Sequence, residues 1–394
     1  MIEYIERLLQ GTEVQWKTLG EVADYEQPTK YLVSSANYND NYSIPVLTAG
    51  KTFILGYTDE TTGIYKASLK PVIIFDDFTT DIKWVNFDFK AKSSAMKMIT
   101  SKSENVALLK FIYYWLCILP KEQSVENHKR HWIGDYSTRS IPIPPLEVQR
   151  EIVRILDKFT ELEKKLGMEL ECRRKQYGYY RDKLLSEEYL LARGMVEWRT
   201  LGEVGEFVRG SGLQKSDLTT EGVPAIHYGQ IYTYYGTYTE KTKSYVSEIF
   251  ATKKRKASYG DLIIATTSEN DEDVCKAVAW LGKSEVVVSS DACFYHHCMV
   301  PKYISYFFQT DIFQLQKRNY ITGTKVRRVN ANDLAKIKIP IPPLEVQEEI
   351  VRILDKFDTL TTSISEGLPR EIELRRKQYE YYRERLLSFD NDNA

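Results

Sequence analysis

The chain has 394 residues, a 43% apolar share and a formal net charge of −1, which suggests two to three ordinary globular domains. This balance excludes a uniformly basic nucleic-acid binder, although DNA binding requires only a local basic face, and the 28 tyrosines suit contact-rich surfaces. Five cysteines without a CxxC pair argue against a disulfide framework and fit a reducing cytoplasm, and the longest apolar run, 111–119, is too short to span a bilayer.

The first predicted domain, 1–140, begins with a short helix that resembles the tail of a longer one. Leu8-Leu9 precede Trp16 much as Leu190-Leu191 precede Trp198, so we expect the chain to be arranged like a cut circle with its termini close together. Strand-like runs of β-branched and aromatic residues occupy 71–78 and 83–89. A helix is expected at 103–119, ended by Pro120.

Basic residues in loops of this first domain are candidate DNA contacts. Cations contact phosphates, and they also reach base edges in the major groove. The candidates here are Lys51 in TAGKTF and the cluster Lys129, Arg130 and His131. Such clusters are also common as solvated surface charge, which is the alternative interpretation of each one.

A conserved linker helix is expected at 141–195. Its apolar positions follow the alternating spacing of three and four residues that is typical of a coiled-coil seam. Pro144-Pro145 fix its start, and a continuous helix from Leu146 to Ser186 would be about 60 Å long. The predicted seam residues are Ile152, Ile155, Phe159, Leu162, Tyr177, Tyr180 and Leu184, with Leu166 and Leu170 between them.

The second predicted domain, 196–338, has strand-like runs at 261–267, 277–282 and 284–290 and a helical pattern at 302–317. Basic residues also concentrate in its loops. A cluster lies just before the next linker helix, as Lys129 to His131 do in the first domain. The candidate DNA contacts are Arg209, Lys254, Arg255, Thr322, Lys325, Arg327, Arg328 and Asn330.

A second conserved linker helix is expected at 339–394. Its predicted seam is Ile350, Ile353, Phe357, Leu360, Ile364, Ile372, Tyr379, Tyr382 and Leu386. This copy is four residues longer than the first between matched segments, the size of a coiled-coil stutter. The sequence Gly367-Leu368-Pro369 predicts a break or kink, with Pro369 in the first turn of a new helix.

The two halves are copies of one unit. IPIPPLEVQREIVRILDKF at 141–159 and IPIPPLEVQEEIVRILDKF at 339–357 differ only at Arg150 and Glu348. RRKQYGYYRDKLLS at 173–186 likewise matches RRKQYEYYRERLLS at 375–388, whereas the domain interiors barely match. We therefore predict an α+β fold in which two domains with mixed sheets are separated by two long antiparallel coiled-coil helices with pseudo-twofold symmetry. The alternative is a plain amphipathic helix lying on its own domain.

The doubled IPIPPLEVQ-x-EIVRILDKF block, joined to RRKQY-x-YYR-x-x-LLS, resembles specificity subunits of type I restriction-modification systems over essentially the full length. The resemblance implies a sequence-specific DNA-binding subunit in which each domain is a target-recognition domain that reads half of a bipartite asymmetric site. The helices would set the spacer and dock two modification (methyltransferase) subunits, and two restriction (translocase-nuclease) subunits would join the larger enzyme. S-adenosylmethionine, ATP and Mg²⁺ would be bound by those partners, and no cofactor is expected on this chain.

Motifs for chemistry on this chain are missing. No NPPY- or DPPY-type methyltransferase motif, Walker A sequence or GxGxxG loop occurs. Asp76, Asp81 and Lys83 have a weak nuclease-like order, His128 and His131 lack a nucleophile partner, and the spacing of Cys293, His296, His297 and Cys298 fits no common zinc site. The rival hypotheses are an independent nuclease or methyltransferase, a coiled-coil adaptor without a DNA role, and a specificity subunit of another system type with the same architecture.

Overall fold

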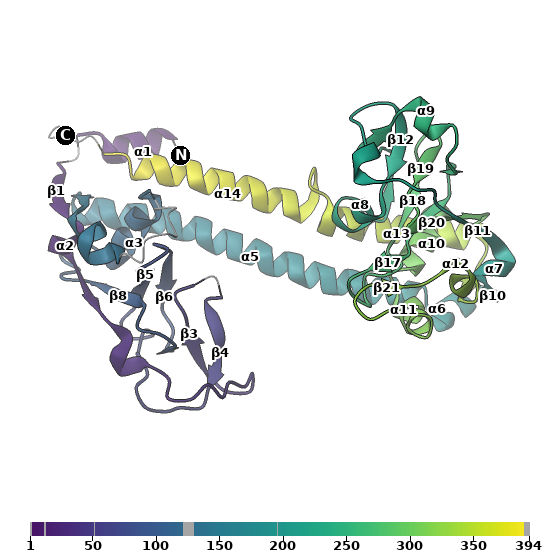
Figure 1. Cartoon of the computed structure of the whole chain (residues 1–394). Coiled ribbons are helices and arrows are strands. Elements are labelled where there is room, and N and C mark those ends of the chain that lie inside the picture. The colour runs from purple at the N-terminus through teal and green to yellow at the C-terminus, as the bar shows by residue number, and fades with distance from the viewer. Residues whose placement is uncertain (1, 12, 51, 121–129, 195, 390–394) are drawn as a thin grey trace. The chain divides into compact units, whose positions relative to one another are not determined.

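The computed structural model describes residues 2–11, 13–50, 52–120, 130–194 and 196–389. The chain divides into two compact units (Figure 1). Unit 1 combines Met1–Lys165 with Glu373–Ala394, and unit 2 is the single stretch Leu166–Ile372. Each unit contains one module of mixed strands and helices together with segments of both linker helices.

Unit 1 is built around two sheets. The larger sheet is antiparallel throughout, with the order β2-β8-β5-β6. The smaller sheet, β4-β3-β7, is mixed, because β3 pairs with β4 antiparallel and with β7 in parallel. The central β5 is buried on both faces, which accounts for its continuous apolar run. The strands are β2 (Ala23–Glu26), β3 (Ile44–Leu47), β4 (Ile54–Thr58), β5 (Val72–Asp76), β6 (Ile82–Val85), β7 (Lys90–Ala91) and β8 (Met96–Ser101).

The helices of unit 1 form one core with its larger sheet. Phe111 and Ile112 of α3 (Leu109–Ile118) pack in the same cluster as Ile152 of α5 (Leu146–Leu184) and Leu386 of α14 (Gly367–Leu386). The N-terminal helix α1 (Ile2–Leu9) adds Ile5 to this core and lies beside the last turns of α14 (Figure 1). The chain therefore brings its first and last helices together in one unit, as the repeat predicts.

Unit 2 has the same plan with different details. Its larger sheet has the order β11-β20-β16-β18-β13, and its second sheet has the order β14-β12-β19-β15. Both sheets are mixed, since β13 runs parallel to β18 and β12 runs parallel to β19. The strands are β11 (Gly205–Arg209), β12 (Val223–Ile226), β13 (Tyr238–Thr239), β14 (Ser244–Val246), β15 (Lys256–Ala257), β16 (Leu262–Ala265), β18 (Ala277–Trp280), β19 (Val286–Val288) and β20 (Ala292–His297).

Two of the predicted helices are shorter or broken. The helix expected at 103–119 begins only at Leu109, because Ser103 closes a turn by accepting from the Val106 and Ala107 amides. The helix expected at 302–317 is split into α10 (Pro301–Phe307) and α11 (Asp311–Arg318). Thr310 causes the split, because its hydroxyl caps α11 by accepting from the Phe313 amide at 3.3 Å.

The predicted break in the second linker helix is confirmed. Helix α13 (Leu344–Thr362) ends before the break, and α14 starts at Gly367 with Pro369 in its first turn. The seam prediction for Ile364 is wrong: this side chain is 82% exposed, because it lies in the loop between the two helices.

Candidate nucleic-acid interface and helix pairs

Each module joins its linker helix through the same two-stranded ribbon. In unit 1, β1 (Gln15–Thr18) pairs antiparallel with β9 (Ser140–Ile143), and in unit 2, β10 (Glu197–Thr200) pairs with β22 (Lys338–Ile341) in the same register. A capping box follows each first strand: Glu21 Oε2 accepts from the Thr18 amide at 2.6 Å, and Glu203 Oε2 accepts from the Thr200 amide at 2.6 Å. These hydrogen bonds lower the pKa of both glutamates. The repeated sequence thus encodes one repeated joint.

A tyrosine–aspartate–lysine contact also fastens each module helix to its linker helix. In unit 1, Asp157 Oδ1 accepts from the Tyr114 hydroxyl at 2.5 Å and lies 3.5 Å from Lys110 Nζ. In unit 2, Asp355 accepts from the Tyr306 hydroxyl at 2.6 Å and pairs with Lys302 at 2.8 Å.

A buried glutamine strengthens the same contact. Gln149 Nε2 donates to the Pro144 carbonyl while its Oε1 accepts from the Leu108 amide, and Gln347 repeats both contacts with Pro342 and Val300. Gln149 and Gln347 are 0% and 1% exposed, so each has replaced its water contacts with these hydrogen bonds. We call this set, with the tyrosine–aspartate–lysine contact, the module latch.

The linker helices pair antiparallel within each unit, through equivalent aromatic contacts. In unit 1, Phe159 of α5 stacks on Tyr382 of α14 with centroids 5.4 Å apart, and Glu163 pairs with Arg376 further along. In unit 2, Phe357 of α13 stacks on Tyr180 of α5, also at 5.4 Å. Apart from Ile364, the principal predicted seam residues are all buried or half-buried: Ile152, Ile155, Phe159, Leu162, Tyr177, Tyr180, Leu184, Ile350, Ile353, Phe357, Leu360, Tyr379, Tyr382 and Leu386.

In unit 2 the structure brings several predicted DNA contacts to one cavity. This cavity, of about 280 Å³, is lined by Arg209 at the end of β11, Arg328 in β21 (Arg327–Arg328), Thr322 and Asn330, with Asp291 among the other lining residues. The short ribbon of β21 with β17 (Thr267–Ser268) positions Arg328 at its rim. The Arg209 side chain donates to the Ser290 carbonyl at a long 3.3 Å.

The residues of this loop divide into structural and available ones. Arg327 is held by Asp271 at 2.8 Å and by the Gly323 carbonyl at 2.7 Å. Asn330 caps a short helix, α12 (Ala331–Leu334), through the Asp333 amide, and the Thr322 hydroxyl donates to the Arg328 carbonyl. Within the described part of the chain, by contrast, the exposed side chains of Lys325 and Arg328 make no hydrogen bond or ion pair.

Lys254 and Arg255 flank the same region. Lys254 Nζ donates to the Gly212 carbonyl at 2.7 Å, and Arg255 Nη2 donates to the Gly210 carbonyl at 3.3 Å. Gly210 directly follows Arg209, so both cations lie close to the end of β11. We use the term cationic surface of unit 2 for the predicted DNA contacts Arg209, Lys254, Arg255, Lys325 and Arg328.

In unit 1, Arg130 occupies the position that corresponds to Arg328. The amide after Arg130 donates to the Asp77 carbonyl at 3.1 Å, and the amide after Arg328 donates to the Thr266 carbonyl at 3.1 Å. Arg130 is exposed. His131, however, is 3% exposed at the start of α4 (His131–Gly134), so its side chain is not available at the surface of this structure. Lys51, His128 and Lys129 lie outside the described residues.

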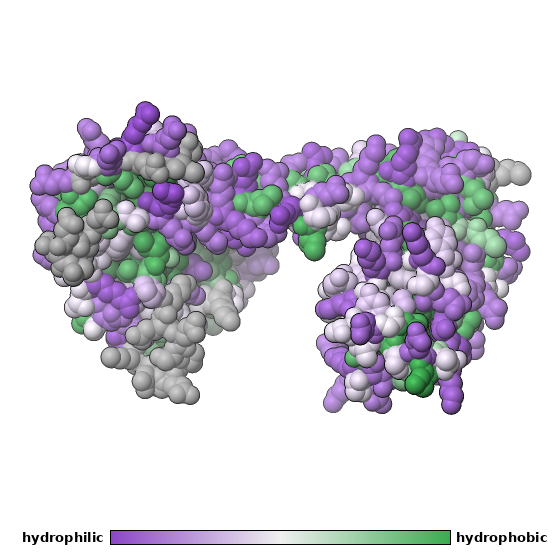
Figure 2. Space-filling view, turned by 90° about the horizontal axis from the view of Figure 1, so that it is seen from above, coloured by the Kyte–Doolittle hydropathy of each residue, from purple (hydrophilic) through white to green (hydrophobic). Residues whose placement is uncertain are grey.

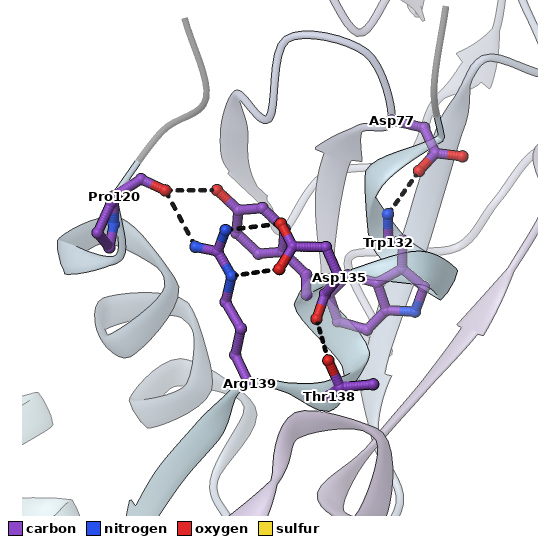
Figure 3. A network of polar contacts seen from close by, with 7 residues as sticks. Asp77, Pro120, Trp132, Asp135, Thr138 and Arg139 are labelled. Atoms are coloured by element: carbon purple, nitrogen blue, oxygen red, sulfur yellow. Dashed lines mark hydrogen bonds and ion pairs between the residues drawn. The ribbon is translucent and has the colours of Figure 1, made fainter.

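A polar network fixes the segment after Arg130 (Figure 3). Asp77 Oδ1 accepts from the Trp132 amide at 2.8 Å, and Arg139 forms a fork with Asp135 at 2.8 and 2.6 Å. Arg139 and the Tyr136 hydroxyl both donate to the Pro120 carbonyl at 3.0 Å. The residues that follow Arg130 are therefore held by polar contacts within unit 1.

Several of these residues were missed by sequence reasoning. Asp77 also pairs with Lys97 at 3.5 Å, and both are almost fully buried, at 2% and 1% exposed. Only the presence of two charges in apolar strands could have indicated this pair. Asp157 and Asp355 lie in the repeated ILDKF segment, but their tyrosine partners lie in the diverged interiors, so the repeat alone could not identify the latch.

The residues considered as candidates for catalysis or metal binding have contacts that stabilise the fold. Asp76 Oδ1 accepts from the amides of Phe78 and Thr79, which makes it a turn former. Cys293 is buried in the core of unit 2, and burial raises the pKa of its thiol. In the described ranges, no group of three or more His, Cys, Asp or Glu side chains has an arrangement that could hold a metal ion.

Comparison with known proteins identifies the family. The model of the type I restriction modification DNA specificity domain matches residues 12–172 and 195–374. The chain is 48% identical to the specificity subunit of the type I restriction enzymes EcoR124I/EcoR124II of Escherichia coli, over 98% of this chain and 97% of that protein. It is 32% identical to a putative type I restriction enzyme specificity subunit of Haemophilus influenzae, with 98% of both chains covered.

The fold agrees with a solved structure. The S subunit of a type I restriction-modification system from M. genitalium matches with a TM-score of 0.56 at 16% identity, covering 97% of this chain and 98% of that one. None of the described helices combines the length and apolar character that crossing a membrane requires. The family model matches the chain twice, and the 48% identity to the Escherichia coli subunit extends over nearly the full length of both proteins. The chain therefore belongs to the type I restriction-modification DNA specificity family.

Proposed function

We propose that each module of this specificity subunit reads one half of a bipartite, asymmetric DNA site, and that the linker helices set the spacer between the halves. As a member of its family, the chain recognises DNA sequence within a restriction-modification assembly and is not itself the catalyst. We assign the target-recognition domains to 1–140 and 196–338 and the linker helices to 141–195 and 339–394. The proposed site of action is the cytoplasm.

The observation that carries this proposal is the contrast between repeated joints and different module interiors. The ribbon, the capping box and the latch are equivalent in the two units. The residues that fill the modules barely match. One scaffold therefore presents two different surfaces, which is what reading two different half-sites requires. On one face of B-DNA such half-sites are about 34 Å apart, or one helical turn.

Within unit 2, the cationic surface supports a division of roles in DNA contact. Arg328 and Lys325 have open donors, so they are suited to base edges or phosphates. Lys254 and Arg255 are tied to backbone carbonyls and are better suited to phosphate contact. In unit 1 we propose Arg130 as the counterpart of Arg328, and Lys51 and Lys129 remain candidate contacts.

The linker helices also support docking of two copies of one partner. Tyr179 and Tyr381 occupy equivalent positions in the repeated YYR segment, and both are exposed, at 60% and 45%. Buried seam positions are constrained by packing, but these two are not, so their identity suggests a shared external contact. Among the mostly hydrophilic atoms of the visible face, Figure 2 shows scattered hydrophobic groups. We propose that two modification subunits bind these surfaces, and that two restriction subunits join the larger complex.

The test is single-molecule sequencing of DNA methylation in cells that express this chain with its cognate modification subunit. A bipartite methylated motif that requires this chain is expected, and it would give both half-sites and the spacer. Cells with the modification subunit alone are the control. If a verified complex produces no new motif, the modules do not direct methylation.

A further inference from the structure

The two linker copies differ in length between their repeated segments, and the structure shows where the extra residues are. In the first copy the intervening residues 160–172 are all helical, within α5. In the second copy, 358–362 and 367–374 are helical, and the four residues 363–366 lie between α13 and α14. Counted by these helix bounds, with Gly367 as the first residue of α14, both copies contain thirteen residues here, and the four residues between the helices account for the whole excess.

The burial of the seam shows the same register. Counted from the first repeated segment, Leu166 matches Ile364, whereas counted from the second it matches Leu368. Ile364 is 82% exposed and Leu368 is 8% exposed. The hydrophobic seam therefore continues from Leu360 to Leu368 as if 363–366 were not there.

Local contacts close the loop. Ser363 Oγ accepts from the amides of Ser365 at 3.3 Å and Glu366 at 3.1 Å. The chain then returns against the last turn of α13, since a Cβ on Gly367 would lie 2.4 Å from the Thr359 carbonyl oxygen. Gly367 has a φ of +81°, so both its conformation and this close approach favour glycine.

We propose that 363–366 is a looped-out insertion that adds no length to the linker, and that the DNA spacer is set by the thirteen helical residues that each copy retains. The part of this inference that concerns the spacer rests on the proposed function. If the four residues were helical, they would add about 6 Å to one helix. At 3.4 Å per base pair, that corresponds to roughly two base pairs of DNA.

Deletion of 363–366 tests the proposal. The chain that lacks 363–366 is expressed with the cognate modification subunit, and the methylated DNA motif is determined by sequencing. We expect unchanged half-sites and an unchanged spacer. The matched control deletes the four residues 163–166 from α5, which we expect to change the spacer. A changed spacer after deletion of 363–366 would overturn the proposal, as would loss of methylation by a complex that still melts like the unaltered one.

A pair of point substitutions tests the register without DNA. In the purified complex, Ile364→Ser should leave the melting temperature within about 1 °C, because Ile364 is already exposed. Leu368→Ser should lower it by roughly 5 °C, because it removes a buried seam side chain. The reverse order would show that Ile364 occupies the seam. If the proposed function is wrong, the unaltered chain will direct no methylated motif. The difference in melting temperature between Ile364→Ser and Leu368→Ser would still be observed.

Discussion

Arg327 and Arg328 are neighbours in the sequence, but their guanidinium groups have different surroundings. Arg327 is bound to Asp271 and to the backbone of its own loop. Arg328 is exposed at the rim of the cavity that Arg209 also lines. A side chain with open donors can gain hydrogen bonds from DNA without breaking any in the protein, so Arg328 is the stronger candidate for base contact.

We therefore expect Arg328→Ala to weaken binding to the half-site of the second module by about 10- to 100-fold, with the preference for the other half intact. Binding by the assembled complex to DNA duplexes substituted in one half at a time measures this effect. Arg327→Ala is the matched comparison, and its main effect should be on the thermal stability of unit 2. Equal loss at both half-sites would contradict the assignment of Arg328 to the second module.

His297 makes the stability of unit 2 depend on pH. Its ring nitrogens are buried, and this burial lowers its pKa to about 4, against the opposing effect of a hydrogen bond with the Met299 backbone. Between pH 6.5 and 4 the unfolded chain therefore takes up a proton that the folded unit does not. The stabilisation is fully present above pH 6.5 and is lost as the pH falls towards 4.

We expect the advantage of the unaltered protein over His297→Phe, in free energy of unfolding, to fall by roughly 2 kcal/mol across this window. Denaturant unfolding of both proteins at pH 7 and pH 4.5 measures it. The double difference cancels contributions from other titrating groups. Parallel pH profiles of the two proteins would show that His297 is hydrated in the folded state.

At the scale of elements, the latch determines how each module helix is held against its linker helix. Burial and the hydrogen bond to Asp355 both raise the pKa of Tyr306, so this hydroxyl remains a donor across the physiological range. The same causes act on Tyr114 with Asp157. Because the latch is present in both units, one substitution has a matched partner in the other.

We expect Tyr306→Phe and Tyr114→Phe each to cost about 1–2 kcal/mol, because each leaves a carboxylate with one hydrogen bond fewer. A double-mutant cycle with Asp355→Ala, which removes the acceptor oxygens, should give a coupling energy above about 0.5 kcal/mol between Tyr306 and Asp355. Tyr303→Phe is a useful comparison, since its hydroxyl donates to the Pro340 carbonyl and not to the aspartate. A coupling near zero would mean that packing alone holds the two helices together.

Elements with strong periodicity could be predicted from the sequence, and those fixed by local polar contacts could not. The seam of α5 and the break at Gly367 follow from heptad spacing and from Gly-Leu-Pro. The split between α10 and α11 depends on the Thr310 hydroxyl, which the apolar run of 302–317 conceals. Ile364 was misplaced because its spacing fits the seam equally well until the loop is seen.

The candidate site was predictable only in part, for a related reason. Clusters of basic residues are visible in the sequence, but whether each cation is open or already bound depends on distant residues. Asp271 engages Arg327 from another loop, and the core encloses His131. The sequence near Arg327 and His131 predicts neither the ion pair nor the burial.

For the whole molecule, the proposed function predicts that a change in the helical length of the linker changes the spacing of the half-sites and nothing else. Insertion of four residues after Gly167 should lengthen the preferred spacer, because it lengthens helix α5. The helix should tolerate the insertion, since this position is exposed and a Cβ there would meet open space among the described residues. The methylated motif reports this directly. Altered half-site bases would contradict the proposal that the modules recognise the bases and the linker helices set the spacer.

The sharing of unit 1 between the two ends of the chain also has a consequence for synthesis. Unit 2 is one continuous stretch that is complete at Ile372, whereas the core of unit 1 includes Leu386 and Leu387 as well as Ile5. A growing chain can therefore close the core of its second module while the first still lacks its last helix. The half of the protein that leaves the ribosome first is the half that finishes folding last, and during that interval its unfilled apolar surface is what chaperones would meet.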